Sequence, residues 1–150
     1  MFGFGAPKAR PLRLMAEEAD DLAPISALVQ DAALRPGDME YDAEGRHFTI
    51  RMNRFCHESK DSVPLRAPSV LRINCVTRVQ RRGLDPRASG TPLSLLDIEV
   101  QPRDAPAHTL VLHFAGGADR DIRLEVECID ILLMDLAAPR RAKSKPVHPA

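Results

Sequence analysis

The stretch LVLHFAGGADRDIRLEVECIDILLMDL, residues 110–136, constrains the fold more than any other part of the sequence. Apolar and polar residues alternate on both sides of Gly116-Gly117, as they do in two strands joined by a tight turn. From Cys128 the apolar spacing changes from two residues to about 3.6, the repeat of a helix. The stretch therefore predicts a β-hairpin followed by a short apolar helix that closes over a sheet, because such a helix is not stable alone in water. The expected buried face of this helix consists of Ile129, Leu132, Leu133 and Leu136.

Patterns along the rest of the chain predict a mainly β fold with a second helix near the N-terminus. Every link between the expected strands is too short to hold a crossover helix, so neighbouring strands should run antiparallel. The predicted fold class is α+β: an antiparallel meander of about six strands, curved or barrel-like, capped by the C-terminal helix. A pleckstrin-homology-like architecture fits this pattern as an analogy of shape only. The further expected elements are an edge strand near Leu12 and Leu14, a helix at 21–33, and strands at 39–42, 47–57, 69–82 and 93–101.

Two of these strands carry predictions about which side chains face the core. Phe55 departs from the inward alternation of Phe48, Ile50 and Met52, which predicts a β-bulge near Asn53-Arg54. In the strand at 93–101, the residues expected to face inward are Leu96, Ile98 and Val100.

The length of 150 residues fits a single domain, which buries about 70% of the surface of its unfolded chain. We expect residues 12–136 to form that domain, between a flexible N-terminus at 1–11 and a disordered basic tail at 137–150. The three cysteines lack CxxC spacing and should be free thiols in a reducing compartment. No apolar run approaches ~18 residues and the N-terminus lacks the apolar segment of a secretory signal, so we expect a cytoplasmic protein without a membrane span.

Charge is arranged in blocks along the chain, although the net charge is zero. Residues 46–87 hold ten basic and three acidic residues, a net of +7, and residues 88–136 hold three basic and nine acidic residues, a net of −6. Consecutive strands are commonly neighbours in a sheet, so these two blocks are expected to neutralise each other across it. The alternative is that they form separate basic and acidic surfaces.

A stripe of arginines is the strongest candidate for a binding site. Guanidinium groups bind phosphate or carboxylate in a bidentate manner, but nucleic acid is not favoured because aromatic residues make up only 4% of the chain. The alternative is a structural ladder in which Arg72 and Arg78 face Asp97 and Glu99 on the next strand. The sequence favours a non-enzymatic binding or adaptor domain whose basic outer surface takes an anionic ligand or a protein partner. The candidate ligand-binding residues are Arg51, Arg54, Arg72, Arg78 and Arg82, and Arg81 and Arg87 extend one end of the stripe.

Two alternatives stay open beside the binding domain. One is an enzyme with a site assembled from loops, for which His57, Glu58 and His113 are the candidates if folding brings them within hydrogen-bond reach. The sequence itself shows no catalytic constellation, no metal-ligand spacing and no cofactor motif. Cys128 is not favoured as a nucleophile, because the carboxylates on either side of it would raise the pKa of its thiol. The other alternative is a homo-oligomer. It is suggested by apolar residues at positions expected to face outward, namely Val76, Leu95 and Val111.

Two stretches of the chain resemble a known family. RLMAEEADDLAPISALVQDAALRPGDMEYDAEGRHFTIRMNRF and FAGGADRDIRLEVECIDILLMDL are similar to an uncharacterised family of small bacterial proteins, catalogued as a domain of unknown function with the number 2948. The likeness covers roughly residues 12–136. It implies a small soluble bacterial protein and carries with it no activity, cofactor, partner or site residue.

Overall fold

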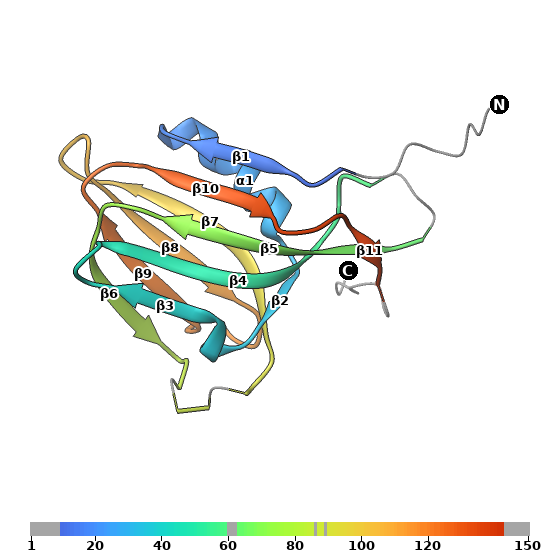
Figure 1. Cartoon of the computed structure of the whole chain (residues 1–150). Coiled ribbons are helices and arrows are strands. Elements are labelled where there is room, and N and C mark those ends of the chain that lie inside the picture. Colours follow the sequence, from blue (N-terminus) through green and yellow to red (C-terminus); the bar gives the residue numbers. More distant parts are fainter. Residues whose placement is uncertain (1–9, 60–62, 86, 89, 143–150) are drawn as a thin grey trace.

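The structure, a computed structural model, describes residues 10–59, 63–85, 87–88 and 90–142, and most of them belong to one antiparallel sheet (Figure 1). The strands are Arg13–Ala16 (β1), Ala32–Leu34 (β2), Met39–Asp42 (β3), His47–Phe55 (β4), Leu65–Ile73 (β5), Val76–Arg82 (β6), Leu93–Pro102 (β7), His108–Phe114 (β8), Asp121–Val126 (β9), Ile131–Asp135 (β10) and Arg140–Arg141 (β11). They follow the order β1-β10-β5-β4-β2-β7-β8-β9-β6, with β3 on β4 and β11 on β5. The two end strands, β1 and β6, do not pair with each other, so the sheet is not closed.

The sheet bends so that both of its halves face one core. In Figure 1, β1, β10, β5 and β4 form the near layer, and β8 and β9 lie behind them. Residues of both layers belong to a single apolar cluster, which includes Phe48 and Leu71 from one layer and Leu112 and Leu124 from the other, and all four are 0% exposed. The short strand β2 joins the layers because it pairs with β4 on one side and β7 on the other.

One α-helix, α1 (Leu22–Val29), packs against β7, β4 and β1 in the described part of the chain. Leu22, Ile25 and Val29 recur at helical spacing and are buried. Ser26 Oγ accepts a 2.9 Å hydrogen bond from the backbone N–H of β7, which ties the helix to the sheet. The predicted N-terminal helix is therefore confirmed, but it is shorter than 21–33. It ends at Val29 because Asp31 adopts a φ of 67° and the chain then enters β2. Two 3-10 turns, Ala19–Asp21 (η1) and Pro36–Asp38 (η2), precede α1 and β3.

The predicted C-terminal helix is wrong. Residues 131–135 form β10, a strand that pairs with β1 on one side and β5 on the other. Ile131 and Leu133 are 0% exposed while Leu132 and Met134 are only partly buried, which is the alternation of a strand. A short apolar run is compatible with either a buried helix or a strand in the interior of a sheet. Here the run forms a strand, because β1 on one side and β5 on the other provide its backbone hydrogen-bond partners. The pleckstrin-homology-like architecture depended on that helix, and the described residues contain no helix after η2.

The predicted simple meander of about six strands is wrong, because the described residues form eleven strands in a different order. The expected long strand at 69–82 divides at Asn74-Cys75 into β5 and β6, and Cys75 adopts a φ of 60°. β6 then crosses to the far end of the sheet beside β9, and β10 returns to lie between β1 and β5. The antiparallel direction itself is confirmed for every strand pair of the described residues.

The predicted bulge near Asn53-Arg54 is wrong, because β4 and β5 pair without a register shift. Arg54 keeps the inward alternation of the strand and is 0% exposed. Phe55 lies on the opposite face, where its ring contacts the ring of His57 edge-on at 4.7 Å and the Arg66 guanidinium stacks at 5.5 Å. The sequence pattern misled because Arg54 was assigned to solvent, whereas Arg54 and Phe55 are both buried, on opposite faces of the strand.

A register shift occurs instead in β7, between Leu95 and Asp97. It turns Leu95, which is 0% exposed, toward the core, while Leu96 is only partly buried. The predicted inward position is therefore wrong for Leu96 and confirmed for Ile98, which is 6% exposed.

The predicted hairpin is confirmed as β8 and β9. Gly116 and Gly117 have φ values of 106° and 146° in the turn, a backbone region that favours glycine. Strand β8 then pairs with β9 on one edge and β7 on the other.

The predicted terminal segments lie largely outside the described residues. This holds for residues 1–9 of the N-terminus predicted at 1–11 and for residues 143–150 of the tail predicted at 137–150. Between Leu136 and residue 143, Arg140–Arg141 pair with β5 as β11. In the described part of the chain no helix is long and apolar enough to cross a bilayer.

Candidate functional site

An exposed apolar patch flanked by arginines covers the outer side of β1, β10, β5 and β4. Residues directly opposite each other in antiparallel strands share a face, so the register places these side chains in two adjacent rows. The first row is Met15–Leu132–Arg72 and the second is Arg13–Met134–Val70–Arg51. We term these seven residues the Met/Arg face.

The apolar members of the Met/Arg face are incompletely covered by the rest of the protein. Met15 is 56% exposed, and Leu132, Met134 and Val70 are only partly buried. Leu136, just beyond the end of β10, is also 56% exposed. A cluster of exposed apolar side chains on adjacent strands is typical of an interaction surface, whereas single ones are common on any protein.

The arginines of the Met/Arg face are available for a ligand. Among the described residues, Arg13 and Arg51 have no ion pair or side-chain hydrogen bond. Arg72 donates a 3.0 Å hydrogen bond from Nε to Asn74 Oδ1, and it forms no ion pair within the described part of the chain. After the hydrogen bond from the Gly45 N–H, its charge is one of the causes that lower the pKa of Asp42 on β3. The first acidic residue along the register is Glu40 of β3, on the far side of Thr49. The face is therefore apolar at its centre and positive at its rim.

A groove of about 460 Å³ adjoins the Met/Arg face at Arg51. It lies where β3 diverges from β4 and β2 takes its place as the neighbour of that strand. Arg35 adds a second guanidinium, and the single acidic residue there, Asp38, accepts a 2.8 Å hydrogen bond from the Arg35 backbone N–H. The groove is lined by Ala33, Leu34, Arg35, Asp38, Arg51, Met52, Asn53, Pro68 and Pro92.

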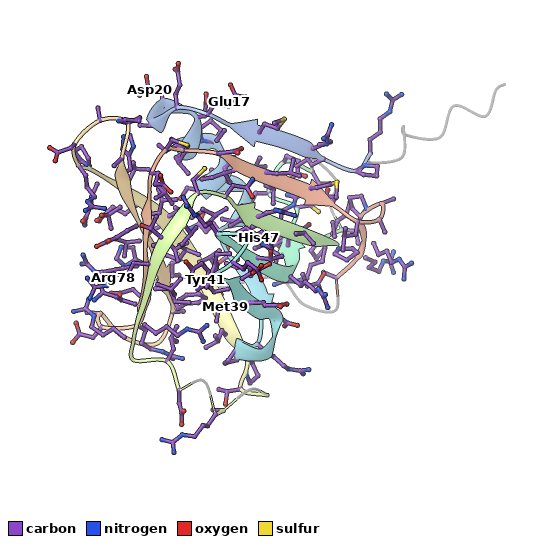
Figure 2. All side chains as sticks on the ribbon, turned by 60° about the vertical axis from the view of Figure 1, so that its left-hand side comes forward. Glu17, Asp20, Met39, Tyr41, His47 and Arg78 are labelled. Atoms are coloured by element: carbon purple, nitrogen blue, oxygen red, sulfur yellow. The ribbon has the colours of Figure 1, made fainter. Side chains whose placement is uncertain are left out.

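The five predicted arginines do not share one surface. Arg51 and Arg72 lie together on the Met/Arg face, whereas Arg54 of the same strand β4 points into the protein. Arg78 and Arg82 lie on β6 at the other end of the sheet, and Figure 2 shows Arg78 directed away from the body of the molecule. The corner at Asn74-Cys75 separates the two groups, because it sends β6 away from β5.

Arg54 is the centre of a buried polar cluster beneath β4, β5 and β10. Its Nε and Nη2 donate hydrogen bonds of 3.0 and 2.9 Å to the two carboxylate oxygens of Asp135. Its Nη1 and Nη2 donate to Glu58 at 2.9 and 2.8 Å. Ser69 Oγ and the backbone N–H of Leu12 donate to Asp135 at 2.6 and 2.9 Å. Each carboxylate oxygen of Asp135 thus accepts two hydrogen bonds from the protein. The cluster is therefore suited to hold three strands together, and Asp135 is not available to bind a ligand.

The cluster keeps its charges at neutral pH. Burial opposes ionisation of Asp135, but the hydrogen bonds from Arg54, Ser69 and the Leu12 N–H outweigh it and hold the pKa of Asp135 below its usual value. Burial likewise opposes the charge of Glu58, and the Arg54 bonds lower its pKa. Burial would lower the pKa of Arg54, but the two carboxylates raise it well above its ordinary value.

Arg82 neutralises acids of the neighbouring strand rather than standing free. Its Nη2 is 2.5 Å from Asp121 Oδ2 and its Nη1 is 3.3 Å from Asp119 Oδ1. The hydrogen bond to Asp121 raises the pKa of Arg82. A small hollow of about 330 Å³ at this edge is lined by Gln80, Arg81, Arg82, Asp121 and Arg123. Arg87, at the end of the predicted stripe, pairs with Asp85 at 3.6 Å.

The expected neutralisation between the two charge blocks is confirmed at four ion pairs of the described residues: Arg46–Glu127, Arg54–Asp135, Arg82–Asp119 and Arg82–Asp121. The particular ladder that was predicted is wrong, because Arg72 and Arg78 do not face Asp97 and Glu99. These two carboxylates lie 3.9 and 3.7 Å from His113 Nε2.

The structure does not bring the candidate catalytic residues together. His57 Nε2 lies 2.8 Å from the backbone oxygen of Gln30, and Glu58 is held by Arg54. His113 is on β8, which β2 and β7 separate from β4, a distance of about 14 Å at the usual strand spacing. Among the described residues no three His, Cys, Asp or Glu side chains are placed to hold a metal ion.

The residues that suggested a homo-oligomer are buried. Val76, Leu95 and Val111 are each 0% exposed, so the prediction that they face solvent is wrong. Val76 and Leu95 belong to the core, and Val111 lies between Glu99 and Arg123 in the register.

Sequence reasoning missed Met15, Leu132 and Met134 as surface residues. Leu132 was assigned to the buried face of a helix, and Met134 belonged to the same apolar run. The one available signal was length: the uninterrupted apolar run 131–134 is short for a helix and usual for a strand.

Comparison with known proteins gives a family but no function. No curated protein and no solved structure matches the chain. The model of one family matches residues 12–148, nearly the whole chain. The chain belongs to this family, which is described as a protein of unknown function, DUF2948.

Proposed function

We propose that the protein is a non-enzymatic binding domain whose Met/Arg face docks an acidic, amphipathic segment of another protein. The observation that carries the proposal is the combination, on one face, of exposed or partly exposed apolar side chains with three arginines that form no ion pair among the described residues. Apolar contacts would supply most of the affinity, and the arginine rim would select for acidic partners. The setting that we propose for this function is bacterial and cytoplasmic; three cysteines without CxxC spacing favour a reducing compartment.

Charge argues against two other occupants of the face. In a symmetric dimer the same patch meets itself, which would bring Arg13, Arg51 and Arg72 of two copies together. The chain's own ends are no better suited, because residues 1–9 and 143–150 contain lysines and no acidic residue. An acidic segment from another protein avoids this repulsion.

The dimensions of the face suit a helix. Its two rows are two residues apart along the strands, about 7 Å, and it extends across four strands, about 14 Å. A helix about 10 Å in diameter laid along the rows would contact both of them. Apolar residues on one side of that helix would meet Leu132 and Met134, and acidic residues on its flanks would reach the arginines.

Binding of designed peptides tests the proposal. The probes are an amphipathic helical peptide with leucines on one face and glutamates on the other, and the same peptide with lysine in place of glutamate. Fluorescence anisotropy should show that the wild-type protein binds the glutamate peptide. Its affinity for the lysine peptide should be lower by about tenfold or more. The double variant Arg51→Glu/Arg72→Glu should reverse this preference, because it inverts the charge of the rim.

The matched control is Arg78→Glu, which changes an exposed arginine on the opposite half of the sheet and should leave both affinities unchanged. Met15→Ser should weaken binding of the glutamate peptide without changing the charge preference. Equal affinity for the two peptides, or no binding of either, would contradict the proposal. Binding to phosphatidylcholine–phosphatidylglycerol vesicles but not to the glutamate peptide would assign the face to a membrane surface instead.

A further inference from the structure

Two cysteines far apart in the sequence meet at the point where the chain crosses between the two halves of the sheet. Cys75 lies in the link between β5 and β6, and Cys128 lies in the link between β9 and β10. The Cys128 thiol donates a hydrogen bond to the Cys75 sulfur, with the two Sγ atoms 3.3 Å apart. A disulfide bond is about 2.05 Å long, so the sulfur atoms need to approach by only about 1.2 Å to bond.

Backbone hydrogen bonds on both sides hold the two links against each other. The N–H of Asn74 donates to the oxygen of Asp130 at 2.9 Å, and the N–H of Glu127 donates to the oxygen of Cys75 at 2.9 Å. The surrounding structure also fixes Cys75 at a φ of 60°, which a residue with a side chain rarely adopts. The two thiols are therefore preorganised by the fold and do not meet by chance fluctuation of loops.

We propose that Cys75 and Cys128 form a reversible intramolecular disulfide that locks the β5–β6 link to the β9–β10 link. The oxidant is a low-molecular-weight disulfide such as glutathione disulfide. A thiolate of the pair attacks one sulfur of the oxidant, forms a mixed disulfide and expels one thiol. The second cysteine then attacks the cysteine sulfur of the mixed disulfide and expels the other thiol. Two electrons and two protons pass from the protein to the oxidant, which ends as two thiols.

The environment of the two thiols permits this exchange and slows it at neutral pH. Both cysteines are partly exposed, so a small disulfide can reach them, whereas Cys56 is 3% exposed. The hydrogen bond with Cys128, followed by burial, raises the pKa of Cys75 to about 11. Because the thiolate is the attacking species, the rate of locking should increase as pH rises toward that value. The Cys75–Cys128 disulfide does not depend on the proposed function, because it forms whether or not a partner binds the Met/Arg face.

The full chain equilibrated with excess glutathione disulfide provides the test. Intact mass should fall by two hydrogen atoms, the count of free thiols in the denatured protein should drop from three to one, and digestion should yield one peptide pair linked through Cys75 and Cys128. Closing a 53-residue separation should raise the melting temperature by on the order of 10 °C. Dithiothreitol should restore the original mass and melting temperature.

Three single variants make the test specific. Cys56→Ala keeps both partners and should lock as the wild type does. Cys75→Ser and Cys128→Ser should take up at most one glutathione on the remaining partner and show no rise in melting temperature. Stable glutathione adducts on both cysteines, a linkage through Cys56, or three free thiols after equilibration would overturn the inference.

Discussion

Replacing Arg54 with methionine tests whether the buried cluster holds β4 and β10 together. Methionine keeps an unbranched apolar stem but is shorter than arginine and has no guanidinium. Asp135, whose side chain is fully buried, would then lose both of its bonds to Arg54 and remain as a carboxylate without a cation. Glu58 would lose its partner too, but 37% of its side chain is exposed and water can replace the bonds.

The expected loss of stability follows from this geometry. Removing one partner of a buried ion pair costs about 3–5 kcal/mol, because the other charge stays buried. Asp135 would retain its hydrogen bonds from Ser69 and the Leu12 N–H, so we expect a value near the lower limit, about 3 kcal/mol. For a domain of this size that loss corresponds to a fall in melting temperature of roughly 6–12 °C.

The loss should depend on pH with a definite sign. In the wild type the pKa values of Asp135 and Glu58 are lowered, so their contribution is present above about pH 4 and is lost as pH falls through the folded-state values. In Arg54→Met, burial without the cation should raise the pKa of Asp135, so the folded variant gains a proton before the unfolded chain does. The stability difference between wild type and variant should therefore shrink as pH falls from 7 to 4.

Urea unfolding followed by far-ultraviolet circular dichroism at several pH values measures both effects. Arg51→Met is the matched control, because it lies on the same strand in an exposed position and should change stability by less than about 0.5 kcal/mol. A loss below about 1 kcal/mol for Arg54→Met at pH 7, or a difference that stays constant with pH, would refute the role assigned to the cluster.

Three further substitutions test the fold by thermal or urea unfolding. Gly83→Ala should cost about 1–3 kcal/mol or more, since Gly83 has a φ of 70° and an added Cβ would lie 2.2 Å from a backbone oxygen; an unchanged melting temperature would contradict this. Tyr41→Phe should cost about 0.5–1.5 kcal/mol through loss of the 2.9 Å bond from the partly buried Tyr41 hydroxyl (Tyr41 is labelled in Figure 2) to the backbone oxygen of Val76; a stabilised variant would count against the bond. Leu133→Ala should cost about 2–5 kcal/mol, and Leu132→Ala clearly less; equal losses would argue against β10 as a strand.

Local pattern predicted the elements whose neighbours in sequence are also their neighbours in space. The hairpin around Gly116-Gly117 is one example, because alternation and turn chemistry act within a few residues. The helix α1 is another, since its apolar spacing marks the buried side without reference to the sheet. The antiparallel direction also followed from the sequence, because short links allow no parallel crossover.

The candidate binding surface was predicted only in part. Arg51 and Arg72 were assigned to an outer face, and the structure places them in the two adjacent rows of the Met/Arg face, with Arg51 opposite Val70 and Arg72 opposite Thr49. Met15 and Leu132, which complete that face, come from strands more than 110 residues apart along the chain, so no local pattern joins them.

The sequence by itself determined the hairpin at Gly116-Gly117, the buried side of α1 and the antiparallel direction of the strands. The tertiary structure alone decided the order of the strands, the inward turn of Arg54 and the exposure of Leu132. The physical reason is that these features depend on partners distant in the chain. Arg54 is stable in the interior only because Asp135 meets it there, and residues 131–135 form a strand only because β1 and β5 offer two open edges.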